Sequence, residues 1–525
     1  MQNNKYIYIS LLAVLSFNNR VLAQRIQQAP RLVVNITIDQ LRTDYLQAFS
    51  PLYGNEGFKR LLNEGRVYSN AAYPFAPIDR ASAWATISTG VTPYYHSVIG
   101  ERWLDKETLR PVYCVDDADV NGIQTQDRTS PKHLTTSTIS DELKVATEGK
   151  AIVYAIAPFR DAAIFAAGHA ADAALWLDDQ NGYWCSSSYY LQQLPAWLQT
   201  YNEANAPANQ IAKTVWEPLT ATTGSFSFFT HTDSRKPFRH KFVKDNRFRS
   251  FKTSALMNEQ VTNLALQCIT SNTMGSDLVT DMLNLTYYAG NFDHKTMTEC
   301  QMELQDTYFR LDREIGKLVS SIERIIGKGE VLFIVTSTGY SDTESTDYAK
   351  YRIPTGTFYI NRTANLLNMY FGAIWGQGRY VEACFRNQMF LNHKLLESRR
   401  VSLTDATMRA QEFLSQLSGV RNTYTSQQLI NNINEQTYKI RNGFNAERNG
   451  DILIEVSPGW RLQNEDTQEN ELSRASFIEF PVIMFGPGIN AERISDRITT
   501  DRIAPTIAKS IRIRAPNACS SEPLF

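Results

Sequence analysis

The sequence has few of the residues from which several common kinds of site are built. Its 525 residues include six cysteines, which form no Cys-x-x-Cys pair, and seven histidines, none of which follows His393. Clusters of thiolate ligands around a metal are therefore not indicated. No Gly-x-Ser-x-Gly sequence occurs either, so the sequence does not support a serine hydrolase built on that turn.

The chain also lacks an excess of charge and a hydrophobic run long enough to cross a bilayer. Its 53 Lys and Arg residues balance 54 Asp and Glu residues, which leaves a formal net charge of -1. This balance gives no electrostatic reason to expect a nucleic acid or an anionic membrane as a partner. The apolar run at 6–15 is too short for a membrane span, so we predict no transmembrane segment.

The first residues have the pattern of an export signal. Lys5 precedes the apolar run, and Val21 and Ala23 are small side chains at the two positions that a signal peptidase reads. We therefore predict a signal peptide at 1–23, a mature domain at 24–525 and a periplasmic or secreted location. No cysteine lies near the cleavage point, so a lipid anchor is not expected. The alternative interpretation is a buried N-terminal strand.

The stretch 32–39, LVVNITID, organises the rest of the chain. It is a β-branched apolar run that ends on Asp39 and is followed by a helix-like segment. In an α/β protein this pattern is typical of a buried parallel strand, and active sites gather at the carboxyl ends of such strands. Further strands are predicted at 151–157, 331–336, 451–456 and 482–485. Helices are predicted at 57–65, 81–88 and 307–326.

The alternation of strands and helices along most of the chain predicts an α/β fold. Its central sheet should be mostly parallel and covered by helices on both faces. Two segments, 170–280 and 365–440, are richer in polar and aromatic residues and are predicted to be insertions or cap regions. Before the helix at 81–88, Asp79 is the expected N-cap, and Gly90 is the expected end. A loop that enters a helix N-terminus is a natural site for an anion.

Several stretches, in their order and spacing, resemble one known family. They are ITIDQLRTDYL, EGFKRLLNEG, ATISTG, AAGHAADAALWLDDQNGYW, QDTYFRLDREIGKL, IRNGFNAERNGDILIEVSPGW and IAPTIAKSIRIRAPNACSSEPL. With them the chain is similar to the alkaline phosphatase superfamily. Within it, the chain resembles the exported Bacteroidetes-type phosphate monoesterases, which are related to type I phosphodiesterases and nucleotide pyrophosphatases. The resemblance spans nearly the whole mature chain and implies an α/β/α sandwich with inserted cap regions.

The resemblance also implies a chemistry, which can be compared residue by residue. Members of this superfamily hydrolyse phosphate esters with a Thr or Ser nucleophile and two zinc ions, which need about six His and Asp ligands. Asp39 matches the first ligand. The nucleophile position falls at Arg80, next to Asp79, and neither side chain can be phosphorylated as a Thr can. The nearby hydroxyls of Ser82 and Thr86 lie inside the predicted helix and in the wrong register.

The other metal-ligand positions differ from the family pattern. Tyr287 and Asn291 stand where the resemblance implies an Asp-x-x-x-His pair. Ser337 and Thr338 stand where it implies an Asp-His dipeptide, and Asn470 lies near the position of the final His. Asp39 is therefore the one matched ligand, and no metal or other cofactor is expected.

The positions that would contact a phosphate differ as well. Glu101 replaces an Asn, whereas Phe159 and Asp161 replace a Lys and an Arg, with Arg160 offset from the expected place by one position. A carboxylate that faces a phosphate pocket repels the phosphate.

Two histidines could change this interpretation. A loop shift could bring His294, in the Asp293-His294 dipeptide, toward the site, but one imidazole and two carboxylates would not make a two-metal centre. His169 matches a family position that serves structure more often than metal binding.

These losses suggest a new role for the residue at the nucleophile position. Without metal ions, Asp39 would be a buried charge with no partner, which is costly. We therefore expect Arg80 to form an ion pair with Asp39 in place of the metal charge. The alternative is that Arg80 points to solvent.

The sequence thus favours an exported pseudophosphatase over an active enzyme. Such a protein would act by binding a protein partner or ligand in the cell envelope. The alternative is a metal-dependent phosphate-ester hydrolase, with zinc, whose site has been rebuilt.

Overall fold

The computed structural model describes residues 29–219, 237–342, 348, 350–431, 434, 435, 437–473 and 478–525. The segment predicted as a signal peptide lies outside these residues, so that assignment stays a prediction. No described helix is long and apolar enough to cross a membrane. All six cysteines are free thiols.

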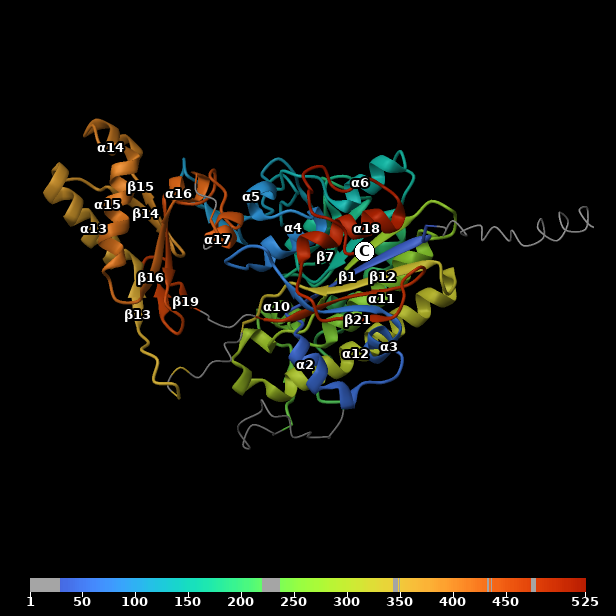
Figure 1. The fold of residues 1–525 in the computed structure, drawn as a ribbon. Coiled ribbons are helices and arrows are strands. Elements are labelled where there is room, and N and C mark those ends of the chain that lie inside the picture. Colours follow the sequence, from blue (N-terminus) through green and yellow to red (C-terminus); the bar gives the residue numbers. More distant parts are fainter. Residues whose placement is uncertain are drawn as a thin grey trace, which may run out of the picture.

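A mixed, mostly parallel sheet forms the centre of the molecule (Figure 1). In its middle, β1 (Leu32–Asp39) is parallel to both of its neighbours, β11 (Asp281–Tyr288) and β12 (Val331–Ser337). Every residue of β1 is buried, as expected for a strand that is covered on both faces. The described strands follow across the sheet in this order: β21 (Glu492–Ile494), β2 (Arg66–Ala72), β20 (Phe480–Phe485), β12, β1, β11, β6 (Val153–Ala157), β7 (Ala173–Leu177), β8 (Trp184–Ser187) and β5 (Gly122–Ile123), with β22 (Ile498–Thr499) beside β2.

Helices cover both faces of this sheet (Figure 1). Alternate residues of β1 point to opposite faces, so that Val33 belongs to one apolar core and Val34 to the other. The face of Val33 is covered by α4 (Arg80–Thr89), α6 (Ile139–Ala146), α7 (Arg160–Ala167) and α18 (Ile503–Ile511). The face of Val34 is covered by α2 (Thr43–Ala48), α3 (Phe58–Glu64), α11 (Leu256–Ser271) and α12 (Gln301–Ile326). This arrangement confirms the predicted α/β fold.

The ends of two helices form as the sequence predicts. Helix α3 ends at Gly65, its C-cap residue. Helix α4 begins after Asp79, whose Oδ1 accepts a hydrogen bond from the Ala81 N–H at 2.9 Å. It ends at Gly90, whose φ of 70° is a left-handed conformation that glycine adopts without steric cost.

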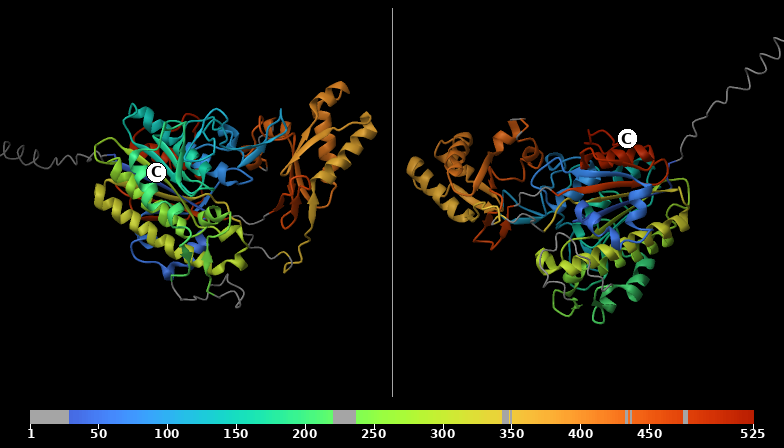
Figure 2. Two further views of the ribbon diagram at one scale, coloured as in Figure 1. Left: turned by 180° about the vertical axis from the view of Figure 1, so that it is seen from behind. Right: turned by 60° about the horizontal axis from the view of Figure 1, so that its bottom comes forward.

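A second lobe projects from the side of the main body (Figures 1 and 2) and has a separate apolar core. Its elements are β13 (Thr357–Tyr359), α13 (Ile360–Trp375), β14 (Val381–Phe385), β15 (Gln388–Leu391), α14 (His393–Ser398), α15 (Leu403–Ser415), β16 (Val420–Thr425), α16 (Ser426–Asn431), α17 (Tyr438–Asn442), β17 (Ile452–Val456), β18 (Arg461–Gln463) and β19 (Asn470–Leu472). The strand predicted at 451–456 is β17, which pairs with β15 and β16 in this lobe and not with the central sheet.

The predicted cap segments contain different kinds of structure. Segment 365–440 lies within the second lobe, whereas segment 170–280 also includes β7, β8 and α11 of the main body. The boundaries of the caps therefore stay a prediction. Other short elements of the main body are α5 (Pro93–His96), β3 (Arg102–Leu104), β4 (Pro111–Tyr113), α8 (Ala196–Asn205), α9 (Pro207–Gln210), β9 (Val215–Trp216), β10 (His240–Lys241) and α10 (Arg247–Lys252), with one-turn 3₁₀ segments at Ser50–Leu52, Phe292–His294, Met297–Glu299 and Thr500–Arg502.

A hairpin connects the second lobe to the main body. Phe385 and Phe390, on β14 and β15, pack with Leu104 of β3 in a small apolar cluster. The turn between β14 and β15 is therefore held against β3 of the main body.

One buried carboxylate fixes the start of α3. Asp312, on α12, accepts hydrogen bonds from the N–H groups of Gly54 at 2.8 Å and Phe58 at 2.7 Å.

We expect Asp312→Ala to lower the free energy of unfolding by about 2–3 kcal/mol, because two N–H groups lose their acceptor. Urea denaturation checks this, with Asp405→Ala in the exposed Asp405–Arg409 pair as the control. Equal, small losses in the two variants would contradict the role given to Asp312.

Candidate active site

The site forms around Asp39 at the carboxyl end of β1. This side chain is fully buried, and each of its oxygens has one partner. Oδ1 accepts a hydrogen bond from the Thr338 hydroxyl at 2.7 Å, and Oδ2 accepts one from Arg80 Nη1 at 3.3 Å. The predicted ion pair of Arg80 with Asp39 is therefore confirmed, and the alternative in which Arg80 points to solvent is wrong.

Arg80 is the cation at the centre of the site. Burial alone would lower its pKa, but four carboxylates raise the pKa well above its ordinary value. They are Asp39, Glu101, Asp161 and Asp342. The guanidinium lies over the Phe159 ring at 5.2 Å, and 18% of the side chain is exposed. Its bond to Asp39 is the single hydrogen bond that the Arg80 side chain makes within the described residues, so the other N–H groups of the guanidinium remain available to a ligand.

An imidazole–carboxylate pair lies beside this ion pair. Asp342 Oδ2 is 2.8 Å from His294 Nδ1 and accepts a hydrogen bond from Gln40 Nε2, also at 2.8 Å. Although burial opposes the charge, these contacts and Arg80 lower the pKa of Asp342 to about 2. The His294 side chain is 46% exposed. Sequence reasoning missed Asp342, although its place soon after β12 puts it at the same end of the sheet as Asp39.

Asp161, in the first turn of α7, is a buried carboxyl group that interacts electrostatically with Arg80. Burial is the main reason that its pKa is raised to about 7, and the negative charge of Glu101 adds to this effect. Arg80 acts in the opposite direction. Burial therefore favours the protonated form of Asp161, which is the form that a general acid requires.

Asp79 is held from two sides. One carboxylate oxygen caps α4 through Ala81, and the other, Oδ2, is 3.1 Å from Arg386 Nη1 of the second lobe. Sequence reasoning did not identify Arg386.

Four of the residues predicted to line the site have other partners. The Tyr287 hydroxyl bonds Thr262 of α11 at 3.0 Å, and it is Tyr288 that pairs with Asp39 across the sheet. Neighbouring residues of a strand point to opposite faces, so Tyr287 cannot also face the site. Asn291 Nδ2 donates to the Lys295 carbonyl, and Ser337 Oγ accepts from the Gly339 N–H. Asn470 is exposed on β19 of the second lobe.

Arg160 does not replace a phosphate clamp. Its guanidinium is 2.9 Å from Asp116 and 3.5 Å from Asp127, and it lies over the Tyr113 ring at 4.1 Å. These contacts hold it outside the group around Arg80. Ser82 and Thr86 are fully buried within α4, which agrees with their exclusion as nucleophiles.

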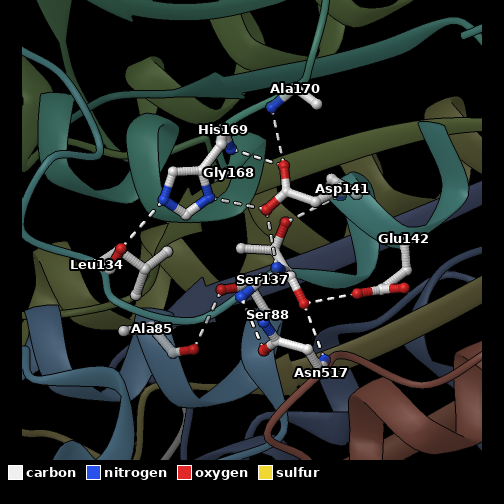
Figure 3. Close-up of polar contacts among 12 residues, drawn as sticks. Ala85, Ser88, Leu134, Ser137, Asp141, Glu142, Gly168, His169, Ala170 and Asn517 are labelled. Atoms are coloured by element: carbon white, nitrogen blue, oxygen red, sulfur yellow. Dashed lines mark hydrogen bonds and ion pairs between the residues drawn. The ribbon is translucent and has the colours of Figure 1, made fainter. Parts of the chain in front are cut away.

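His169 belongs to a separate polar network (Figure 3). Its Nδ1 is 2.9 Å from Asp141 Oδ2, and its Nε2 is 3.0 Å from the Leu134 carbonyl. Asp141 also accepts hydrogen bonds from the N–H groups of Thr138 and Ala170. Both nitrogens of His169 are therefore engaged, and the residue ties α6 to the loop after α7.

The residues around Asp39 do not fit two zinc ions. A guanidinium and a hydroxyl take up the two Asp39 oxygens, and a guanidinium is no metal ligand. In the part of the chain that the structure describes, no group of three or more His, Cys, Asp and Glu side chains could hold a metal ion. The cation that pairs with Asp39 is Arg80.

Comparisons with known proteins define the class. Residues 33–476 match the family described as type I phosphodiesterase/nucleotide pyrophosphatase. This match covers most of the chain, and the protein belongs to that family.

Its relatives include alkaline phosphatases of similar length. Alkaline phosphatase PafA of Elizabethkingia meningoseptica is 27% identical over 542 residues, which cover 98% of each chain. Alkaline phosphatase PhoV of Synechococcus elongatus is 28% identical, over 93% of this chain and 91% of its own. The crystal structure of wild-type PafA superposes with a TM-score of 0.79 at 26% identity, over 94% of this chain and 98% of the other.

These relatives overturn one prediction from the sequence. The loss of zinc ligands predicts a non-catalytic protein that acts by binding a partner or ligand. The chain is instead similar, over nearly its whole length, to proteins named as phosphatases, in a family named for phosphodiesterases. The comparison of this chain with the zinc ligands of the family tests only a two-zinc mechanism. That comparison also took no account of Asp342.

The Asp39–Arg80 pair yields a prediction about stability. We expect Arg80→Met to lower the free energy of unfolding at pH 8 by about 3 kcal/mol, because Asp39 is left as a buried charge with no cation. Burial already raises the pKa of Asp39, so the loss should shrink as the pH falls and the carboxyl group becomes protonated. Adding Asp39→Asn should restore most of the stability. Denaturation at several pH values tests this, and a loss that does not change with pH would contradict it.

Proposed function

We propose that the protein hydrolyses phosphate esters at the site around Arg80. The observation that carries this proposal is the arrangement of three groups: one fixed cation with free N–H donors, an imidazole–carboxylate pair, and a carboxyl group that titrates near neutral pH. The family and the named phosphatases among its relatives support it. The N-terminal pattern supports export from the cytoplasm as part of the same proposal.

Arg80 would bind the phosphoryl group. A guanidinium offers several N–H donors in one plane, and these match the oxygens of a phosphate. The contact with Asp39 uses one donor and fixes the orientation of the side chain, while Phe159 supports it from the side. A single guanidinium offsets one negative charge, and the carboxylate of Glu101 lies nearby. A diester, with one charge, should therefore bind better than a doubly charged monoester.

His294 and Asp161 would handle the protons. The ring of His294 is oriented by Asp342 through Nδ1, and Nε2 makes no hydrogen bond to any described residue. Nε2 can therefore take a proton from a water molecule whose oxygen attacks phosphorus. The bond from phosphorus to the leaving oxygen breaks, and Asp161 donates a proton to that oxygen. The products are an alcohol and a phosphate, or a phosphate monoester if the substrate is a diester.

The first experiment measures hydrolysis of bis(p-nitrophenyl) phosphate and p-nitrophenyl phosphate. We expect the diester to react faster, and we expect kcat/KM to fall by about 100-fold in Arg80→Met and in His294→Gln. Arg362→Met, in an exposed ion pair with Glu465 at 2.7 Å in the second lobe, is the control and should leave the rate unchanged. Wild-type protein that releases no more nitrophenol than buffer would overturn the proposal.

The pH dependence tests Asp161. Because burial raises the pKa of this carboxyl group to about 7, its acid form is lost as the pH rises through that value. We expect kcat/KM to fall on the alkaline side of about pH 7. In Asp161→Asn the rate should be lower, and this alkaline decline should disappear. An equal decline of kcat/KM in the variant would mean that another group, and not Asp161, causes it.

A further inference from the structure

The second lobe places a charged residue beside the site. Arg386 lies in the turn between β14 and β15, with a φ of 48°. Its Nη1 is 3.1 Å from Asp79 Oδ2, and its Nε is 3.7 Å from Glu471 of β19. Asp79 directly precedes Arg80 in the chain, so this contact joins the second lobe to the residue next to the proposed phosphate-binding cation.

Packing on both sides fixes the position of Arg386. Phe385 and Phe390 anchor its hairpin on Leu104. On the other side, a Cβ atom added to Gly100 would lie only 3.0 Å from Arg386 Nη1 and 3.4 Å from the Asp79 carboxyl group. The absence of a side chain at this position lets the guanidinium approach Asp79.

The contact with Arg386 sets the orientation of the Asp79 carboxylate. Asp79 uses one oxygen to cap α4 and the other to contact Arg386. Without Arg386, the Asp79 carboxylate would lose its cationic partner. Asp79 directly precedes Arg80, and Arg80 already has four carboxylates around it. A fifth carboxylate would compete with a phosphate for the free N–H groups of Arg80.

We propose that Arg386 is a positioning residue of the phosphate-ester site, which holds Asp79 away from Arg80 and so keeps the Arg80 donors free for the substrate. The second lobe is then part of the site and not only an appendage of the fold. This inference rests on the proposed function for its catalytic consequence, but its effect on phosphate binding can be measured without turnover.

The test compares four proteins: wild type, Arg386→Met, Arg386→Lys, and Arg386→Met combined with Asp79→Asn. Inorganic phosphate is titrated into each by calorimetry, and KM and kcat are measured with bis(p-nitrophenyl) phosphate. We expect Arg386→Met to weaken phosphate binding and raise KM by about tenfold, with a smaller change in kcat. Lys should restore part of the loss, because it keeps the charge without the guanidinium geometry.

The double variant is decisive. Asn caps a helix about as well as Asp but carries no charge, so Asp79→Asn should rescue phosphate binding in the Arg386→Met background. A purely structural role of Arg386 predicts no rescue, because the double variant loses more contacts than the single one. Arg362→Met is again the control for a lost arginine in the same lobe.

The outcomes separate this inference from the proposed function. If wild type binds phosphate but does not hydrolyse the ester, the proposed function fails, while the titrations still decide the role of Arg386. Unchanged phosphate binding in Arg386→Met, a loss that Asp79→Asn does not rescue, or no phosphate binding by the wild type would overturn the inference.

Discussion

The ion pair between Asp39 and Arg80 is the interaction on which the rest of the site depends. The central strand ends on a carboxylate that the two helical layers bury completely, and a buried carboxylate needs a positive partner. Here the first residue of α4 provides that partner. Because the charge comes from a side chain, it is held in place by the same packing that forms the fold. It also brings N–H donors, which a phosphate can share with Asp39.

The surroundings of this pair follow from the sheet and from the second lobe. Strand ends bring Asp39, Tyr288 and Thr338 together, and the turn after β12 adds Asp342 with His294. Helix α7 contributes Asp161, and burial raises the pKa of this carboxyl group. The second lobe supplies the counter-charge for Asp79. Arginine, carboxylates and one imidazole thus occupy the region in which metal ligands were expected from the resemblance.

Much of the fold could be predicted from local patterns. The apolar run ending on Asp39, the cap at Asp79 and the glycine at position 90 each specify an element through nearby residues. The pairing of Arg80 with Asp39 could also be predicted, since a buried charge requires compensation. Contacts between distant segments could not: Asp79 and Arg386 are separated by 307 positions, and no local pattern links them.

Backbone details account for other residues that were missed or misplaced. Asp293 and His294 both have left-handed backbone, with φ of 51° and 53°, and this turn brings the His294 ring to Asp342. Tyr287 was placed in the pocket from the family pattern, but Tyr288 is the residue that pairs with Asp39 across the sheet, and neighbouring residues of a strand point to opposite faces. The prediction of a non-catalytic protein was wrong for a different reason: it rested on a comparison of metal ligands alone, whereas relatives that match nearly the whole chain are named phosphatases.

The central claim is that Arg80, and not a pair of zinc ions, supplies the positive charge for phosphate-ester hydrolysis. The most direct measurement is the rate of bis(p-nitrophenyl) phosphate hydrolysis before and after metal ions are removed with a chelator, with bound zinc counted by elemental analysis. The account predicts an unchanged rate and no stoichiometric zinc. Two zinc ions per chain, with a rate that is lost on their removal and restored on their return, would contradict it.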